Sequence, residues 1–190
     1  FANGTIIKVI TVDDSFILAG LNAGTYTIYA NYSGDTNYAP AQDNITITVA
    51  KASNEITVYA QDVIYGEDVT ITIIADADGE YNLNINGKKF IIHVLNGIGI
   101  VNLGIMDTGN YTVQVIFAGN DNYNASANKT TFEVIKTETN FNIIVNDSSI
   151  TYGDPITVTQ SLPGDATGSI TYYFANGTII KVITVDDSFI

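Results

Sequence analysis

Seventeen residues occur twice without a single change, at positions 1–17 and again at 174–190. An identical stretch of this length does not recur by chance, so the chain is expected to be a window on a tandem array with a period of 173 residues. Self-similarity at a fixed period predicts stacked structural modules. The lone methionine is Met106, from which we expect the chain to be a piece of a longer protein.

A second, weaker repeat predicts the size of one module. Residues 24–38 align with 109–123 at an offset of 85, and Lys51 and Lys136 close the two copies at the same offset. The middle module is therefore expected at 52–136, a length that can just bury a core of its own. The segment 1–51 is then the C-terminal part of one module, and 137–190 is the N-terminal part of another. The links lack Gly and Pro, which favours end-to-end modules with limited bending.

The apolar residues are mainly Ile, Val, Tyr and Phe, which suit a pleated, half-buried surface. Thr and Asn alternate with them at a period of two, as in antiparallel strands with one solvated face. Asn86-Gly87 and Asn96-Gly97 are typical of two-residue hairpin turns. The expected strands are 5–12, 15–19, 25–32 and 44–50, then 55–60, 69–75, 81–86, 88–94, 98–103, 111–117 and 130–135, and finally 169–174.

The seven short strands expected between residues 55 and 135 are regularly spaced, which predicts that the middle module is an antiparallel β-sandwich. The chain as a whole is expected to be all-β. The predicted core comprises the apolar residues on one side of these strands: Val69, Ile71, Ile73, Leu83, Ile85, Val101, Leu103, Tyr111, Val113, Val115, Phe132 and Val134.

Charge and composition exclude several classes of partner. The 20 acidic residues outnumber the 7 basic ones, all of which are Lys, for a net charge of −13. Such a surface repels DNA and RNA, so no nucleic-acid partner is expected. No apolar run approaches the ~20 residues that span a bilayer, so no membrane span is predicted. The absence of Cys excludes disulfides.

One pattern occurs in both copies of the weaker repeat: an apolar residue, two further residues, Gly, one residue and Tyr. It covers Leu21 to Tyr26, with Gly24, and Met106 to Tyr111, with Gly109. In a sandwich this pattern favours a tyrosine corner, in which the phenol bonds back to the backbone. The alternative is simply a buried aromatic side chain after a turn.

These motifs resemble those of the bacterial immunoglobulin-like repeats. The resemblance rests on Tyr65-Gly66 and Tyr152-Gly153, on the Gly-x-Tyr pattern, and on Tyr-Ser-Gly-Asp-Thr-Asn-Tyr at 32–38, from which 117–123 departs. Similar modules occur in tandem in large adhesin-like surface proteins of bacteria and methanogenic archaea. The resemblance implies immunoglobulin-like antiparallel β-sandwich modules in tandem, an extracellular location at the cell surface or cell wall, and no catalysis.

Asn-x-Ser/Thr sequons occupy eight of the 20 Asn residues, where chance predicts about three or four. They indicate a glycosylated surface protein. The alternative is that alternating Asn and Thr on a solvated face produce the triplet automatically. Asn124 and Asn128, expected in a loop, are the preferred acceptors, with Asn31 and Asn146 as further candidates.

No residue set predicts a metal, a cofactor or an enzyme. Calcium needs 6–8 oxygen ligands, which no acidic cluster here supplies. His93, the lone histidine, has no nucleophile or second ligand beside it in the sequence and is expected on a sheet face. Lys51 and Lys136 are candidates for a Lys–Asn cross-link.

Two functions remain open. The first is a structural stalk or spacer repeat that holds a distal region away from the cell, with the neighbouring modules as its partners. The second is a binding module whose loops or exposed tyrosines, Tyr29 and Tyr173, engage cell-surface glycans or proteins. Thr and Asn dominate the outward positions, which favours the spacer.

Overall fold

The computed structural model describes residues 7–11 and 14–185, and no helix occurs among them. The chain forms two compact units, Phe1–Lys136 and Thr137–Ile190. The all-β prediction is confirmed. The boundary between the units follows Lys136, where the sequence predicts a module end, whereas the predicted boundary after Lys51 lies inside the first unit.

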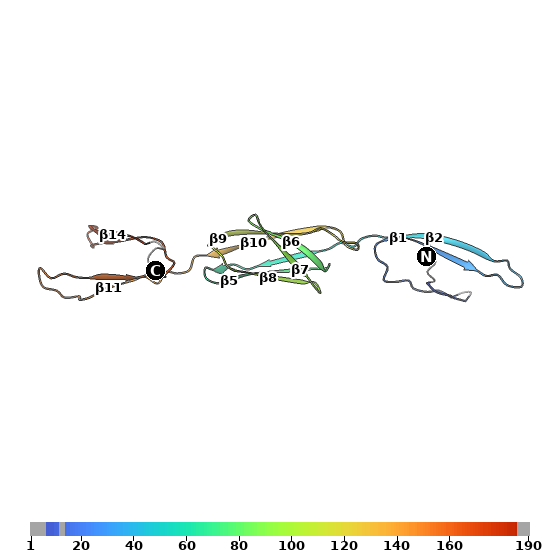
Figure 1. The fold of residues 1–190 in the computed structure, drawn as a ribbon, viewed down its shortest axis with the longest axis horizontal. Helices are drawn as coiled ribbons and strands as arrows, with labels where there is room; N and C mark the ends of the chain where they lie inside the picture. The colour runs from blue at the N-terminus through green and yellow to red at the C-terminus, as the bar shows by residue number, and fades with distance from the viewer. Residues whose placement is uncertain (1–6, 12–13, 186–190) are drawn as a thin grey trace. The chain divides into compact units, whose positions relative to one another are not determined.

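The first strands of the first unit are the hairpin β1–β2, which pairs over its whole length (Figure 1). A two-sheet sandwich follows, and the second unit contains two further strand pairs. The strands are β1 (Gly24–Tyr32), β2 (Ala41–Val49), β3 (Ile56–Ala60), β4 (Val63–Ile64), β5 (Asp68–Ala75), β6 (Gly79–Ile85), β7 (Lys88–Val94), β8 (Ile98–Ile105), β9 (Gly109–Phe117), β10 (Ser126–Ile135), β11 (Asn142–Val145), β12 (Val158–Ser161), β13 (Gly168–Tyr173) and β14 (Ile179–Val185).

The sandwich consists of a three-stranded sheet in the order β3-β5-β8 and a five-stranded sheet in the order β4-β10-β9-β6-β7. Figure 1 shows the two sheets as two layers, with β5 and β8 facing β6, β9 and β10. All pairs are antiparallel except β4 with β10, which is parallel. The β4 strand has only two residues, too few to show a period in the sequence.

The core lies between these sheets, and the predicted set is confirmed. Nine of the twelve predicted residues are buried, while Val101, Leu103 and Tyr111 are partly buried against them. The prediction missed eight further buried residues of the described chain: Ile56, Val58, Ala75, Ala77, Tyr81, Ile92, Val94 and Phe117. The rings of Tyr81 and Phe117 stack with centroids 4.8 Å apart.

Both Asn-Gly turns form, because Asn86 and Asn96 have φ of 46° and 53° and each is followed by a glycine with positive φ. The Asn86-Gly87 hairpin is confirmed, since it joins the paired strands β6 and β7. The Asn96-Gly97 turn instead joins β7 to β8 of the other sheet, and only Leu95 and Ile98 pair across it.

Two predicted strands do not form. Residues 15–19, and residues 7–11 of the segment predicted at 5–12, are irregular; positions 5, 6 and 12 lie outside the described residues. Residues 7–11 recur unchanged at 180–184, inside β14, and there they form a strand because β14 pairs with β13. Thus an identical stretch is a strand only where a neighbouring strand supplies its hydrogen bonds.

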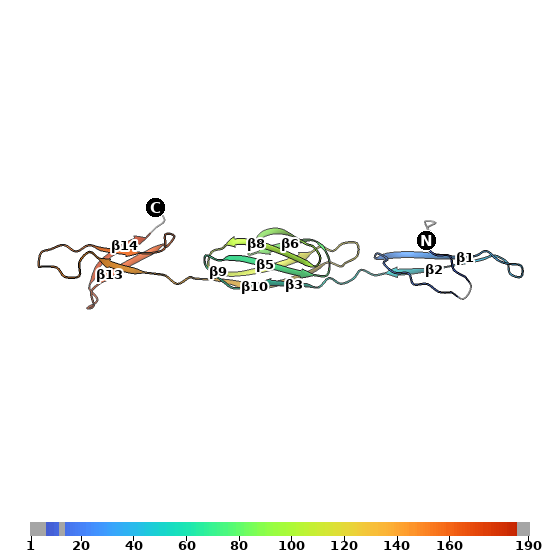
Figure 2. The same cartoon turned by 90° about the horizontal axis from the view of Figure 1, so that it is seen from below.

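The chain enters the sandwich at one end and leaves it at the other (Figures 1 and 2). Ala52 pairs with Tyr123, next to the start of β10, whereas Ile135 at the end of β10 accepts a hydrogen bond from the Tyr65 N–H. Since β10 has 10 residues, the two connections lie about 30–35 Å apart at ~3.3 Å per residue.

Candidate functional site

Two tyrosine side chains hydrogen-bond to the backbone of the turns that precede β1 and β9. The Tyr26 hydroxyl donates to the Asn22 carbonyl at 2.9 Å, and the Tyr111 hydroxyl donates to the Asp107 carbonyl at 2.8 Å. Gly24 and Gly109, each two residues before its tyrosine, have φ of 151° and 150°. These bonds have the geometry of a tyrosine corner.

A third tyrosine makes the same kind of bond. The Tyr81 hydroxyl donates to the Ala77 carbonyl at 2.7 Å, and Gly79, two residues before it, has φ of 146°. Sequence reasoning missed this tyrosine, although Gly79-Glu80-Tyr81 carries the Gly-x-Tyr signal. Unlike the other two, Tyr81 is fully buried, and this burial raises the pKa of its phenol.

We expect Tyr111→Phe to lower the free energy of unfolding of the sandwich by about 0.5–1.5 kcal/mol, because one intramolecular hydrogen bond is lost without a change of shape. The matched control is Tyr59→Phe, since the exposed hydroxyl of Tyr59 bonds to no described residue. Amide hydrogen exchange in β9 would measure both variants. Equal effects would mean that the corner contributes nothing.

Asn54 forms a buried polar cluster beside Tyr81. Its Nδ2 donates to the Tyr81 hydroxyl at 2.9 Å and to Ser126 Oγ at 3.0 Å, and its Oδ1 accepts the Ala77 N–H at 2.9 Å. Every buried side-chain nitrogen and oxygen of the described residues is hydrogen-bonded. The cluster therefore joins the two sheets at the end where the chain enters the sandwich.

The β9–β10 loop (residues 118–125) holds the β1–β2 hairpin against the sandwich. Asn122 Oδ1 accepts the Ala23 N–H at 2.9 Å, while Asn122 Nδ2 donates to Asn22 Oδ1 at 3.1 Å. The Lys51 ammonium donates to the Asn120 carbonyl at 2.6 Å. These contacts form a specific junction, and they place Lys51 on a backbone carbonyl.

The linker itself adds two backbone bonds to this junction. The Ala52 N–H donates to the Asn122 carbonyl at 2.8 Å, and the Asn124 N–H donates to the Ala52 carbonyl at 2.9 Å. The linker is thus paired with the loop like a short strand, which limits bending at this point.

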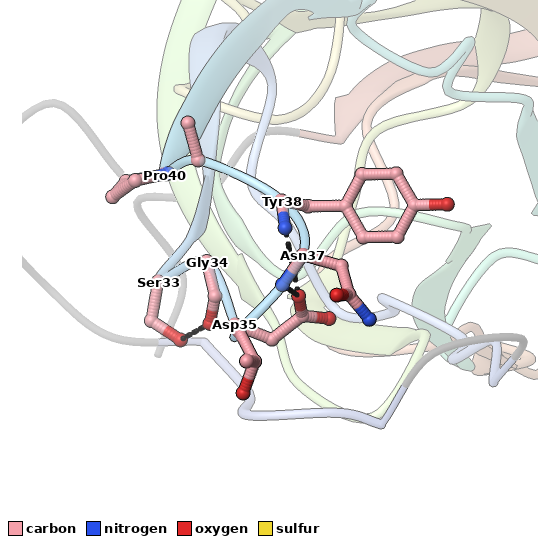
Figure 3. Close-up of a pocket in the computed structure, with 8 residues that line it drawn as sticks. Ser33, Gly34, Asp35, Asn37, Tyr38 and Pro40 are labelled. Atoms are coloured by element: carbon pink, nitrogen blue, oxygen red, sulfur yellow. Dashed lines mark hydrogen bonds between the residues drawn. The ribbon is translucent and has the colours of Figure 1, made fainter.

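The β1–β2 loop (residues 33–40) has the same local structure. Asp35 Oδ1 accepts the N–H groups of Asn37 and Tyr38 at 2.7 and 2.8 Å (Figure 3), as Asn120 Oδ1 does for Asn122 and Tyr123. The loop lines a hollow of about 370 Å³ that is open to solvent. Its outer groups are exposed, with Tyr38 69% accessible.

Two glycines at equivalent positions allow both loops to close tightly. A Cβ on Gly34 would lie 2.8 Å from the Tyr38 carbonyl oxygen, and one on Gly119 would lie 2.9 Å from the Ala125 nitrogen. Both glycines also have positive φ. Only glycine fits there, so the two loops share one tightly closed structure.

We expect the β1–β2 loop to loosen in acid. The backbone N–H of Asn37, the Tyr32 hydroxyl and the Tyr38 N–H, in that order, hold the pKa of Asp35 below its ordinary value of 3.8. Because this pKa is lowered in the folded state, the stabilisation is present above pH 3.8 and is lost as the pH falls through the folded pKa.

NMR titration of the Asn37 and Tyr38 amide protons would measure this change. The control lies in the same chain, since the amide oxygen of Asn120 does not titrate and its bonds to Asn122 and Tyr123 should persist. Equal titration of the two loops, or a midpoint above 3.8, would contradict the assignment.

The candidate glycosylation sites differ in how their side-chain nitrogens are used. The prediction that Asn128 lies in a loop is wrong: β10 continues back to Ser126, and Asn128 Nδ2 donates to the Ile56 carbonyl. Asn124 is in the β9–β10 loop, where its Nδ2 donates to the Lys51 carbonyl at 3.4 Å. Asn31 and Asn146 are exposed, and their Nδ2 atoms bond to no described residue.

The remaining candidates lie apart from one another. His93 is exposed in β7, paired with Glu80 of β6. Over residues 7–11 and 14–185, no three His, Cys, Asp or Glu side chains gather as a metal site would require. In the same ranges, no helix is long and apolar enough to cross a membrane.

A hollow of about 490 Å³ opens on the outer face of the three-stranded sheet. It is lined by one exposed aromatic ring, one valine and four polar side chains: Tyr59, Val63, Gln61, Asp68, Thr70 and Thr72. The sequence did not indicate this feature, because it combines residues from three separate segments. Tyr29 and Tyr173, the tyrosines predicted as exposed, are exposed.

No family model matches this chain, and no curated protein matches it.

Proposed function

We propose that the chain is a structural spacer repeat from the stalk of an adhesin-like cell-surface protein, with no enzymatic role. The observation that carries this proposal is the path through the sandwich, which the chain enters at one end and leaves at the other. Each such module adds its own length to the chain. The paired linker at Lys51 and Ala52 adds stiffness, which a stalk requires.

We also propose that the modules are immunoglobulin-like. Two features support this assignment: a three-stranded sheet packed on a sheet that contains β10, β9, β6 and β7, and a tyrosine corner at the start of β9. In an immunoglobulin-like sandwich these strands correspond to the G, F, C and C′ strands, and the corner opens strand F.

An extracellular location is part of this proposal. A net charge of −13 keeps an extended polymer hydrated, and the accessible sequons at Asn31 and Asn146 suit a secreted chain. Antibodies against the chain should label intact cells of the source organism. Labelling only after lysis would contradict the location.

Pulsed electron paramagnetic resonance would test the spacer role. Spin labels are placed at Ser53→Cys and Lys136→Cys, in a chain diluted with unlabelled protein. They should give one narrow distance distribution, whose mean is about 30–35 Å plus the length that the label side chains add. A broad or short distribution would show that the module does not hold its ends apart.

The hollow at Tyr59 favours a second candidate function, a glycan-binding module. One exposed ring beside amide, hydroxyl and carboxylate groups can stack on a sugar and bond its hydroxyls. Glycan-array binding that Tyr59→Ala abolishes would establish this function. The spacer proposal expects the wild-type chain to bind no glycan on the array.

A further inference from the structure

We propose that the β1–β2 loop is an interaction site for a second copy of this chain. The second copy would contact it with its linker at Lys136 and Thr137 and with the turn at Asp107 and Thr108. This inference does not rest on the stalk function, since it follows from a contact that the chain already makes within itself.

The contact within the chain is the junction at the β9–β10 loop. There Asn122 bonds to the turn at Asn22 and Ala23, and the linker at Lys51 bonds to the loop backbone. Every residue of this junction has a counterpart 85 residues away in the weaker repeat. On the loop side the counterparts lie earlier in the chain: Asn37 for Asn122 and Asp35 for Asn120. On the turn and linker side they lie later: Asp107 for Asn22, Thr108 for Ala23, Lys136 for Lys51, and Thr137 for Ala52.

The second set is chemically complete but unpaired. The side chains of Asn37, Asp107 and Lys136 are exposed, and none of them bonds to a described residue. The β1–β2 loop has the same Gly and Asx geometry as its counterpart, so it presents Asn37 as the β9–β10 loop presents Asn122. In the occupied junction Asn122 is half-buried, whereas Asn37 is exposed.

The equivalence fixes the proposed bonds. Asn37 Oδ1 would accept the N–H of Thr108 of the second copy, and Asn37 Nδ2 would donate to the carboxylate of Asp107 of the second copy. The ammonium of Lys136 of the second copy would donate to the Asp35 carbonyl. Asp107 replaces the neutral Asn22 of the internal junction, so the amide here meets a charged acceptor, which strengthens the bond.

The proposed interface is heterologous, because the loop of one copy meets the linker of the next. Such contacts build linear assemblies rather than closed dimers. Sedimentation of the 190-residue chain over a dilution series, in enough salt to screen the net charge, should show a mass that rises with concentration.

A set of near-isosteric variants tests the site itself. Asn37→Asp places two carboxylates in contact and should shift the rise in mass to at least about tenfold higher concentration. Asn44→Asp, an equal charge change within exposed β2, should leave it unchanged. Asp107→Asn recreates the Asn–Asn pair of the internal junction and should resemble the wild type.

The double variant Asn37→Asp/Asp107→Asn should restore association to within about threefold of the wild type, because an amide again faces a carboxylate. This rescue separates a direct contact from local misfolding. A wild-type mass that stays monomeric up to the solubility limit would overturn the proposal. Equal behaviour of Asn37→Asp and Asn44→Asp, or a double variant that stays dissociated, would also overturn it.

Discussion

Replacing Ile71 by Ala is expected to lower the free energy of unfolding of the sandwich by about 2–5 kcal/mol. Ile71 lies in β5, the central strand of the three-stranded sheet, between Ala60 of β3 and Val101 of β8. Its side chain is 0% accessible. The loss combines the burial of three carbons with the cavity that the rigid neighbouring strands leave behind.

The matched control for this loss is Ile74→Ala in the same strand. Ile74 points outward and is 43% accessible, so the same truncation should cost less than about 1 kcal/mol. Hydrogen exchange of the β5 and β9 amides would measure both variants in the intact chain. A larger effect for Ile74 would mean that the buried and solvated faces of β5 are exchanged.

Asn54→Ala is expected to destabilise the sandwich by about 1–3 kcal/mol, although it removes a polar side chain from the interior. The Ala77 N–H, which is fully buried, loses its acceptor, and the Tyr81 hydroxyl loses a donor. An unpaired buried donor costs its full desolvation energy, so the loss exceeds that of an ordinary surface hydrogen bond.

Asn82→Ala is the control, because Asn82 lies next to Tyr81 in β6 but is exposed. It should change the free energy of unfolding by less than about 0.5 kcal/mol. Exchange of the Ala77 amide should accelerate in the Asn54 variant more than that of amides in β7. Unchanged protection of the Ala77 amide would show that a water molecule replaces Asn54 Oδ1 as the acceptor of its hydrogen bond.

Alternation and turn chemistry predicted most of the sandwich. Strands such as β7 and β9 bury every second side chain, so a period of two identifies them as strands. In β9 it also identified the core residues Val113 and Val115, whereas the buried Ile92 and Val94 of β7 were not in the predicted core. The Asn86-Gly87 and Asn96-Gly97 turns could also be predicted from the sequence, because few dipeptides accept positive φ at both positions.

Features that depend on distant partners were not predictable from local pattern. The two residues of β4 are a strand only because β10 lies beside them. Asn54 looks like a loop residue in the sequence, since its partners Tyr81 and Ser126 lie 27 and 72 residues away. Residues 7–11 have a strand sequence without a strand structure, since nothing in the local pattern shows whether a pairing strand will be present.

The parallel pairing of β4 with β10 has a mechanical consequence. Tension between the two linkers would pull β4 and β10 along their axes in opposite directions, so the hydrogen bonds between them, including Tyr65 N–H to the Ile135 carbonyl, would be loaded together in shear. Bonds that share a load must break at once, whereas those of a hairpin opened at its end break singly. We therefore expect the sandwich to resist pulling strongly; rupture at the low force of an unzipping hairpin would show that tension reaches it by another route.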